Sequence, residues 1–250
     1  MSQKADHHGP DLEALRERLA KFPGHETLVS WVAGFRDEIK KLEYGAVSRW
    51  VKRQNEVSHE RAEREGNDLY TVNRLRPDGH IDSQTTVPVA AEPHRVLAAL
   101  REVTWSTWWR HSDTEVQEID DAGRIRRFDI YPLGRGLAPN IKVTITFGEP
   151  RSETLEDGPG IVLPAKFRGD FHGDGKLEIT ELPNGSRLRI FWPNFEVTGS
   201  LSAFPGLAIV LHGNTLEGHP FSVVGNESSM HGTGFEGLRH YLEAETASGS

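Results

Sequence analysis

Apolar residues recur every three or four positions through the first quarter of the chain, which places them on one face of a helix. The pattern is broken at Pro23-Gly24 and ends in a polar run over residues 54–65. It predicts a helical extension over residues 11–65, preceded by a tail at residues 1–10. Two apolar stripes carry this prediction: Leu12, Leu15, Leu19 and Phe22, then Leu28, Phe35, Ile39 and Leu42.

From about residue 69 the period changes to two, which is typical of strands with one buried face. Leu188, Ile190 and Trp192 alternate with Arg187, Arg189 and Phe191, for example. Glycine-containing turns at 121–123 and 184–185 predict hairpins. Pro164 interrupts a long alternating run and indicates an edge or a bend. A final helix is expected from about Thr233 to Glu245.

The predicted elements follow a recognisable order. A strand and a short helix entry at 85–100 (TTVPVAAEPHRVLAAL) are followed by the tryptophans Trp105, Trp108 and Trp109, and then by the later strands and the final helix. This order resembles the START-related (SRPBCC, helix-grip) superfamily over residues 80–245. The resemblance implies an α+β fold: a curved antiparallel sheet wrapped around a long C-terminal helix, with an apolar cavity between them. We assign residues 66–246 to this domain and 247–250 to a tail.

Charge and composition exclude several classes of binding partner. Acidic and basic residues balance up to residue 65, so the whole net charge of −8 falls on residues 66–250. Phosphate contacts need excess Lys and Arg, so no nucleic-acid partner is expected. The longest apolar stretch, Phe204–Leu211, is far below the roughly 20 residues of a membrane span. The chain has no cysteine and begins without an apolar leader, which favours a cytoplasmic location.

Strand alternation groups apolar residues on one face of the expected sheet, with only Ser83, Thr85 and Arg126 polar among them. Such a wall suits an apolar or aromatic ligand held by few hydrogen bonds. The alternative is that these residues only fill the core. The candidate ligand-binding residues are Trp105, Trp109, Phe128, Phe147, Phe167, Phe171 and Trp192, together with the polar His212 and Glu227.

Few polar groups are candidates for chemistry. His111, Arg126 and His231 are the side chains that we expect to move protons if the protein is an enzyme. His212, His219 and His231 with Glu227 are residue types of a zinc site, but no paired spacing such as His-Glu-x-x-His occurs. We therefore expect neither a metal nor a cofactor.

Three functions remain open on the sequence alone. The leading hypothesis is a protein that encloses a hydrophobic or aromatic small molecule. The resemblance also implies an alternative, a cyclase, aromatase or dehydratase that acts on a ligand held in the cavity. The third is an interaction module whose N-terminal helices dock a partner. An isolated amphipathic helix is marginal in water, so the stripe ending at Leu42 should pack on the outside of the main domain or form a homodimer.

Overall fold

The computed structural model of the 250-residue chain describes residues 44–76, 80–103, 105–109, 112–132, 141–199, 202, 216–217 and 234–248. The helices expected within residues 11–43 and the tail at 1–10 lie outside these ranges. The described helices are α3 (Tyr44–Glu65), α4 (Pro93–Arg101), α5 (Trp105–Trp108) and α7 (Gly234–Ser248). The helix α7 continues past 246, where the domain was expected to end.

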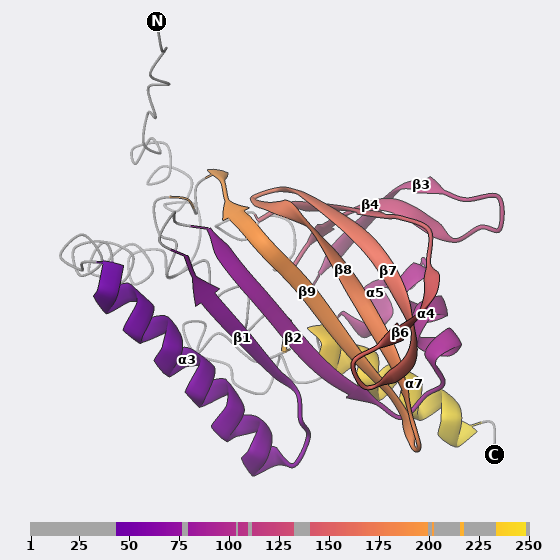
Figure 1. The fold of residues 1–250 in the computed structure, drawn as a ribbon. Helices are drawn as coiled ribbons and strands as arrows, with labels where there is room; N and C mark the ends of the chain where they lie inside the picture. The colour runs from indigo at the N-terminus through magenta and orange to yellow at the C-terminus, as the bar shows by residue number, and fades with distance from the viewer. Residues whose placement is uncertain are drawn as a thin grey trace, which may run out of the picture.

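Nine strands form one antiparallel sheet in the order β1-β2-β9-β8-β7-β5-β4-β3, with β6 paired to β7 beside β5. Figure 1 shows this sheet lying across α7, so the predicted α+β helix-grip architecture is confirmed. The strands are β1 (Tyr70–Leu75), β2 (Ile81–Val89), β3 (Asp113–Ile119), β4 (Ile125–Tyr131), β5 (Val143–Phe147), β6 (Arg151–Leu155), β7 (Gly158–Gly169), β8 (Phe171–Leu182) and β9 (Gly185–Val197).

The predicted alternation along β9 is correct. Leu188, Ile190 and Trp192 are all buried, and their parity puts them on one face of the sheet. The helix α7 has a buried apolar stripe: Phe235, Leu238 and Leu242 are at most 3% exposed. The helix α7 contacts both β2 and α5, and it thus closes the apolar face of the sheet.

Pro164 lies inside the sheet, where β7 changes its partner. Residues Ala165–Gly169 of β7 pair with β5, whereas Gly158–Val162 pair with β6. Pro164 falls between the two ladders, so its missing N–H interrupts neither of them. Its carbonyl oxygen accepts a hydrogen bond from the backbone N–H of Gly148, the residue after β5. The proline therefore marks a change of partner rather than an edge of the sheet.

The helix α3 packs on β1, and the burial of β1 shows which face it covers. Thr71 pairs with Thr85 of β2, which pairs in turn with Ile190 of β9, so these three side chains share one face. Thr71 is buried on that face, whereas Val72 on the opposite face is 41% exposed. The helix α3 thus covers the apolar face of the sheet at its β1 edge, and α7 contacts the neighbouring strand β2.

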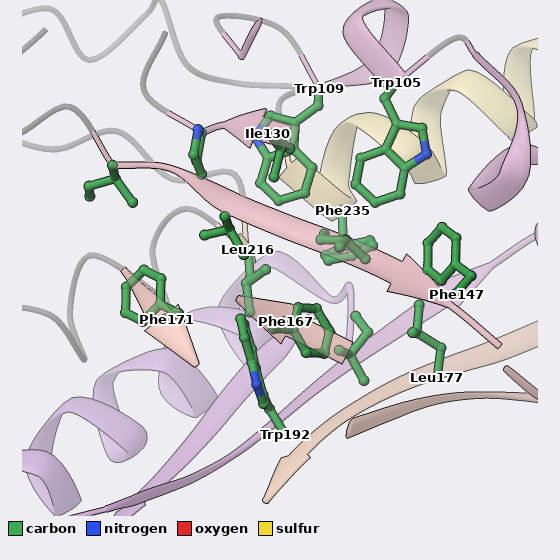
Figure 2. Close-up of a pocket in the computed structure, with 15 residues that line it drawn as sticks. Trp105, Trp109, Ile130, Phe147, Phe167, Phe171, Leu177, Trp192, Leu216 and Phe235 are labelled. Atoms are coloured by element: carbon green, nitrogen blue, oxygen red, sulfur yellow. The ribbon is translucent and has the colours of Figure 1, made fainter. Parts of the chain in front are cut away.

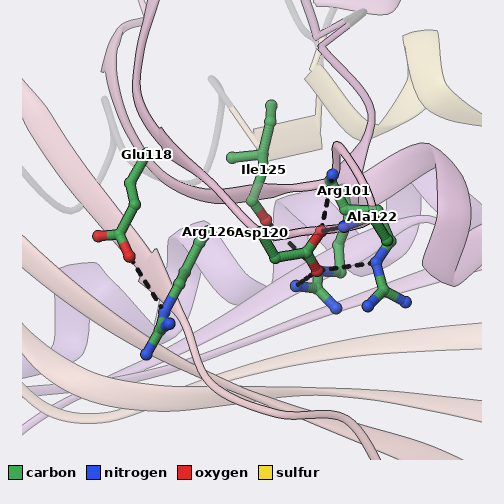
Figure 3. Close-up of polar contacts among 7 residues, drawn as sticks. Arg101, Glu118, Asp120, Ala122, Ile125 and Arg126 are labelled. Carbon is green, nitrogen blue, oxygen red and sulfur yellow. Dashed lines mark hydrogen bonds and ion pairs between the residues drawn. The ribbon is translucent and has the colours of Figure 1, made fainter.

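A buried arginine ties α4 to the β3–β4 turn (Figure 3). The Arg101 guanidinium donates to Asp120 Oδ2 at 3.0 Å and to the carbonyl oxygen of Ile125 at 3.4 Å. Asp120 also accepts the side chain of Arg124 and the backbone N–H of Ala122. Because α5 follows α4 after a few residues, this anchor fixes the place of the tryptophans.

Candidate functional site

A cavity of about 60 Å³ lies between the apolar face of the sheet, α5 and α7 (Figure 2). Seven of its lining residues are aromatic and the others are aliphatic. The aromatic residues are Trp105, Trp109, Phe147, Phe167, Phe171, Trp192 and Phe235. The aliphatic residues are Ile130, Pro132, Ile141, Val143, Ile145, Leu177, Ile190 and Leu216.

The helices supply one group of rings. Trp105 and Trp109 are four residues apart, which puts them on the same side of a helical turn, and their rings stack at a centroid distance of 5.8 Å. Phe235 of α7 lies edge-on to Trp109 at 5.6 Å. The indole N–H of Trp105 donates to the carbonyl oxygen of Leu100 at 2.9 Å, so this ring is held by α4.

The strands supply the second group of rings. Phe167 of β7 and Trp192 of β9 come within 3.8 Å between centroids, and Phe171 lies 6.0 Å from Trp192. Between β7 and β9 runs β8, where the register shifts between His172 and Lys176. The shift makes the segment around Asp174 and Gly175 a bulge relative to β9.

Two glycines of β8 make room for these rings. A Cβ atom at Gly173 would lie 3.1 Å from Trp192 Nε1, and one at Gly175 would lie 3.2 Å from Phe167 Cε2. Real Cβ contacts are rarely so close, so both rings rest on positions that carry no side chain. The glycines thus let the aromatic rings lie low on the sheet and leave the cavity open above them.

Six of the seven aromatic residues predicted for the ligand site line the cavity: Trp105, Trp109, Phe147, Phe167, Phe171 and Trp192. The seventh, Phe128, does not line it. Its ring is fully buried behind the wall, 4.6 Å from Trp105 and 5.9 Å from Phe147. Phe128 therefore supports the cavity instead of facing it.

The prediction that Arg126 faces the cavity was wrong. Its side chain is 53% exposed and pairs with Glu118 of β3 at 3.4 Å (Figure 3). The register of β3 against β4 shifts on both sides of Glu118, close to the hairpin turn. Strand parity places Arg126 with Phe128 and Ile130, but its position near the turn takes it beyond the cavity.

The other histidine and glutamate candidates lie outside the described residues: His111, His212, His219, Glu227 and His231. Within the described part of the chain, no three His, Asp or Glu side chains come together as metal ligands would. No helix of the described part is long and apolar enough to cross a membrane.

Leu216 is a lining residue that sequence reasoning missed. It belongs to none of the predicted strands, and nothing in its neighbourhood distinguishes it from other leucines. Phe235 belongs to the buried stripe of α7, and the spacing of that stripe does not indicate a cavity. Leu163, Ile179 and Leu188 are buried on the same face of the sheet but do not line the cavity.

A buried polar network borders the cavity on the β1 side. Glu217 is 2% exposed; it accepts a hydrogen bond from Ser58 Oγ at 2.7 Å and one from Arg61 Nη2 at 3.0 Å. Burial raises the pKa of the Glu217 carboxyl, and the contacts with Ser58 and Arg61 oppose that rise. The Thr71 and Thr85 hydroxyls meet at 3.0 Å beside it.

The cavity itself offers no acid or base among the described residues. All its described lining side chains are hydrocarbon, apart from the indole N–H groups. A container of this kind binds through burial of apolar surface and ring contacts, at about 25 cal/mol for each Å² removed from water. Proton transfer would need a group from elsewhere in the chain.

Comparison with known proteins gives matches of structure and none of sequence. No protein-family model and no curated protein matches the chain. A STAR-related lipid transfer protein (fragment 25–204) from Xanthomonas axonopodis is 16% identical; the match covers 70% of this chain and 94% of that one, with a TM-score of 0.46. A START superfamily protein from Mycobacterium smegmatis is 18% identical, over 56% and 96% of the two chains, with a TM-score of 0.35.

These solved structures belong to the superfamily that the sequence resembles, and the likeness concerns the fold. The feature of this chain that bears on a ligand is its own cavity.

Proposed function

We propose that the protein binds a hydrophobic, aromatic small molecule in the cavity between the sheet, α5 and α7. The observation that carries the proposal is the lining: seven aromatic rings, with no titratable side chain among the described residues. Aromatic rings prefer offset or edge-on contacts at centroid distances of about 4.5–7 Å, and several pairs here already have that spacing. A flat apolar molecule inserted between the two groups of rings would make the same contacts.

The size of the cavity sets a condition on binding. Sites for drug-sized ligands have roughly 300–1,000 Å³, several times the volume of about 60 Å³ found here. A ligand of that size therefore enters only if side chains move apart. The rings of Trp109 and Phe235 are the ones to move, because Trp105 is hydrogen-bonded to α4 and Phe167 and Trp192 lie directly on the sheet.

Two measurements test the proposal. Native mass spectrometry of freshly purified protein would reveal a small molecule that survives purification. Titration with N-phenyl-1-naphthylamine, a neutral aromatic fluorophore, should give saturable binding that Phe171→Ala weakens about 10-fold. Phe191→Ala, on the opposite face of β9, is the matched control and should bind as the wild type does. Absence of saturable binding in the wild type would refute the proposal.

The enzymatic alternative requires a proton-transferring group at the cavity. Arg126 does not provide it, because its guanidinium pairs with Glu118 at the far end of the hairpin. His111 and His231 remain the side chains to test. If a cyclase or dehydratase activity exists, replacing either histidine by alanine should lower turnover about 10-fold or more. If both variants instead bind and act as the wild type does, neither histidine belongs to the site.

A further inference from the structure

Leu216 and Glu217 are neighbours in the chain with different surroundings. Leu216 lines the cavity, whereas the Glu217 carboxylate is buried against α3. Two of its partners, Ser58 and Arg61, are three residues apart and so lie on one face of that helix. The position of one wall residue is thus tied to a helix that lies outside the predicted cavity domain.

The tie is continuous with the sheet. Ser58 Oγ donates to Glu217 and accepts the backbone N–H of Thr71 at 3.1 Å. Thr71 bonds to Thr85 through their hydroxyls, and Thr85 pairs in register with the lining residue Ile190. Arg61 adds the positive charge that compensates the buried carboxylate. A buried carboxylate that loses such a partner is costly, so the contact resists separation.

We propose that Glu217 is a positioning residue, which holds Leu216 in the cavity wall through Ser58 and Arg61, and that α3 is therefore part of the binding unit. The consequence for a ligand rests on the proposed function, but the position of the wall does not. Removing Arg61 alone takes the positive charge away from the buried carboxylate, which favours movement of Glu217 outward and of Leu216 with it. Removing both charges leaves a neutral amide in the same place, and the wall stays closed.

The absence of cysteine from the chain allows a direct test in the full-length protein. Leu216→Cys introduces a single thiol at a position that is 9% exposed. We expect 5,5′-dithiobis(2-nitrobenzoate) to label this thiol slowly. Adding Arg61→Gln should make the labelling about 10-fold faster. Adding Arg61→Gln and Glu217→Gln together should make it slow again. Arg61→Lys, which keeps the charge, should label slowly.

Electrostatics alone predicts the opposite order. Loss of the Arg61 charge raises the pKa of a nearby thiol and slows its reaction, whereas loss of the Glu217 charge speeds it. The expected pattern therefore reports movement of the wall. Arg53→Gln is the matched control, since Arg53 lies on the same helix with an exposed side chain paired to Glu56 and Glu60. It should leave labelling unchanged.

Equal labelling rates in all these variants, measured well below their melting temperatures, would overturn the inference. So would fast labelling of the variant that lacks both charges. Release of N-phenyl-1-naphthylamine then tests the consequence for a ligand, in proteins that keep Leu216. Arg61→Gln should speed release of the probe about 10-fold. Arg61→Gln and Glu217→Gln together should return the release rate to that of the wild type. If the thiol is labelled in the expected pattern but the protein does not bind the probe, the positioning of Leu216 by Glu217 is supported and the proposed function is refuted. If the probe is released at the same rate from every variant, the link between this contact and the ligand is refuted.

Discussion

The rings of Phe167 and Trp192 lie 3.8 Å apart between centroids, at an interplanar angle of 37°. They come from β7 and β9, which are separated in the sheet by β8. Such a close approach across an intervening strand is possible because that strand carries Gly173 and Gly175 at the point of contact. The floor of the cavity is thus shaped by missing side chains as much as by large ones.

The floor should be a major source of stability. Trp192→Ala removes a ring that is 4% exposed and packs against Phe167, Phe171 and Phe195. We expect a loss of about 3–5 kcal/mol in the free energy of unfolding, measured with urea. Phe191→Ala removes a half-buried ring on the other face of the same strand and should cost clearly less. Equal losses would contradict the packing described for Trp192.

The two glycines should differ in tolerance. A Cβ at Gly175 would collide with the carbonyl oxygen of Phe191, a backbone atom that cannot move aside, whereas the nearest atoms at Gly173 are mostly of side chains. Gly175→Ala should therefore lower the free energy of unfolding by about 2 kcal/mol or more. Gly173→Ala should cost about 1 kcal/mol, because its nearest atoms are 3.1–3.2 Å away and need to move by only a few tenths of an ångström. Urea denaturation of both variants measures this; a larger loss at Gly173 would refute the argument.

Arg101 and Arg124 share the carboxylate of Asp120 but lie in different environments. The Arg101 side chain is 2% exposed and that of Arg124 is 51% exposed. Arg101→Gln should lower the melting temperature by roughly 5 °C, because a buried hydrogen bond to a charged group is lost. Arg124→Gln should change it by at most about 2 °C, as exposed ion pairs contribute little. Comparable shifts would show that the anchor of α4 does not depend on burial.

Asp129 should make part of the stability sensitive to acid. Its carboxylate is buried, which opposes ionisation, but Lys142 at 2.7 Å and Thr144 at 2.6 Å outweigh this and lower its pKa. A lowered folded-state pKa contributes stability above the unfolded value of about 3.9, and that contribution is lost as pH falls through the folded pKa. Asp129→Asn should therefore lose less unfolding free energy than the wild type between pH 7 and pH 3.

Lys142→Met tests the cause of the same effect. It removes the cation beside Asp129, so the pKa of that carboxyl should return toward its ordinary value. Urea midpoints measured across the pH range should show a smaller acid-dependent loss in this variant too. If Asp129→Asn and Lys142→Met both follow the wild-type profile, other carboxyl groups dominate the acid response.

Local patterns predicted strands and turns, and the resemblance to the START-related superfamily implied how the strands form a sheet around the last helix. The alternation of Leu188, Ile190 and Trp192 fixed the face of β9, and the Asn184-Gly185 turn located its hairpin. These signals are local because successive side chains of a strand point to opposite faces, so the alternation can be seen in the sequence of one strand. The aromatic members of the wall that lie on strands, Phe147, Phe167, Phe171 and Trp192, followed from the same alternation.

Parity does not say how far along a strand the cavity extends. Arg126 lies near a hairpin turn, and Leu188 lies on the buried face of β9, yet neither lines the cavity. The contact between Ser58 and Glu217 joins residues 159 positions apart, and no spacing in the sequence announces it. Pro164 was expected at an edge or a bend, because the switch of partner from β5 to β6 depends on tertiary pairing and leaves no local pattern.

The link between α3 and Glu217 also orders events during synthesis. At about 5–20 residues per second, Glu217 follows Arg61 out of the ribosome by about 8–30 seconds, because 156 residues separate them. Strand β9 must likewise be made before β2 gains its second neighbour. The earliest helix of the described chain is therefore among the last to be fully bonded, and a nascent chain carries Arg61 without its carboxylate for most of its translation. Contacts of such long range slow folding, so acquisition of the native cavity wall should be a late kinetic step.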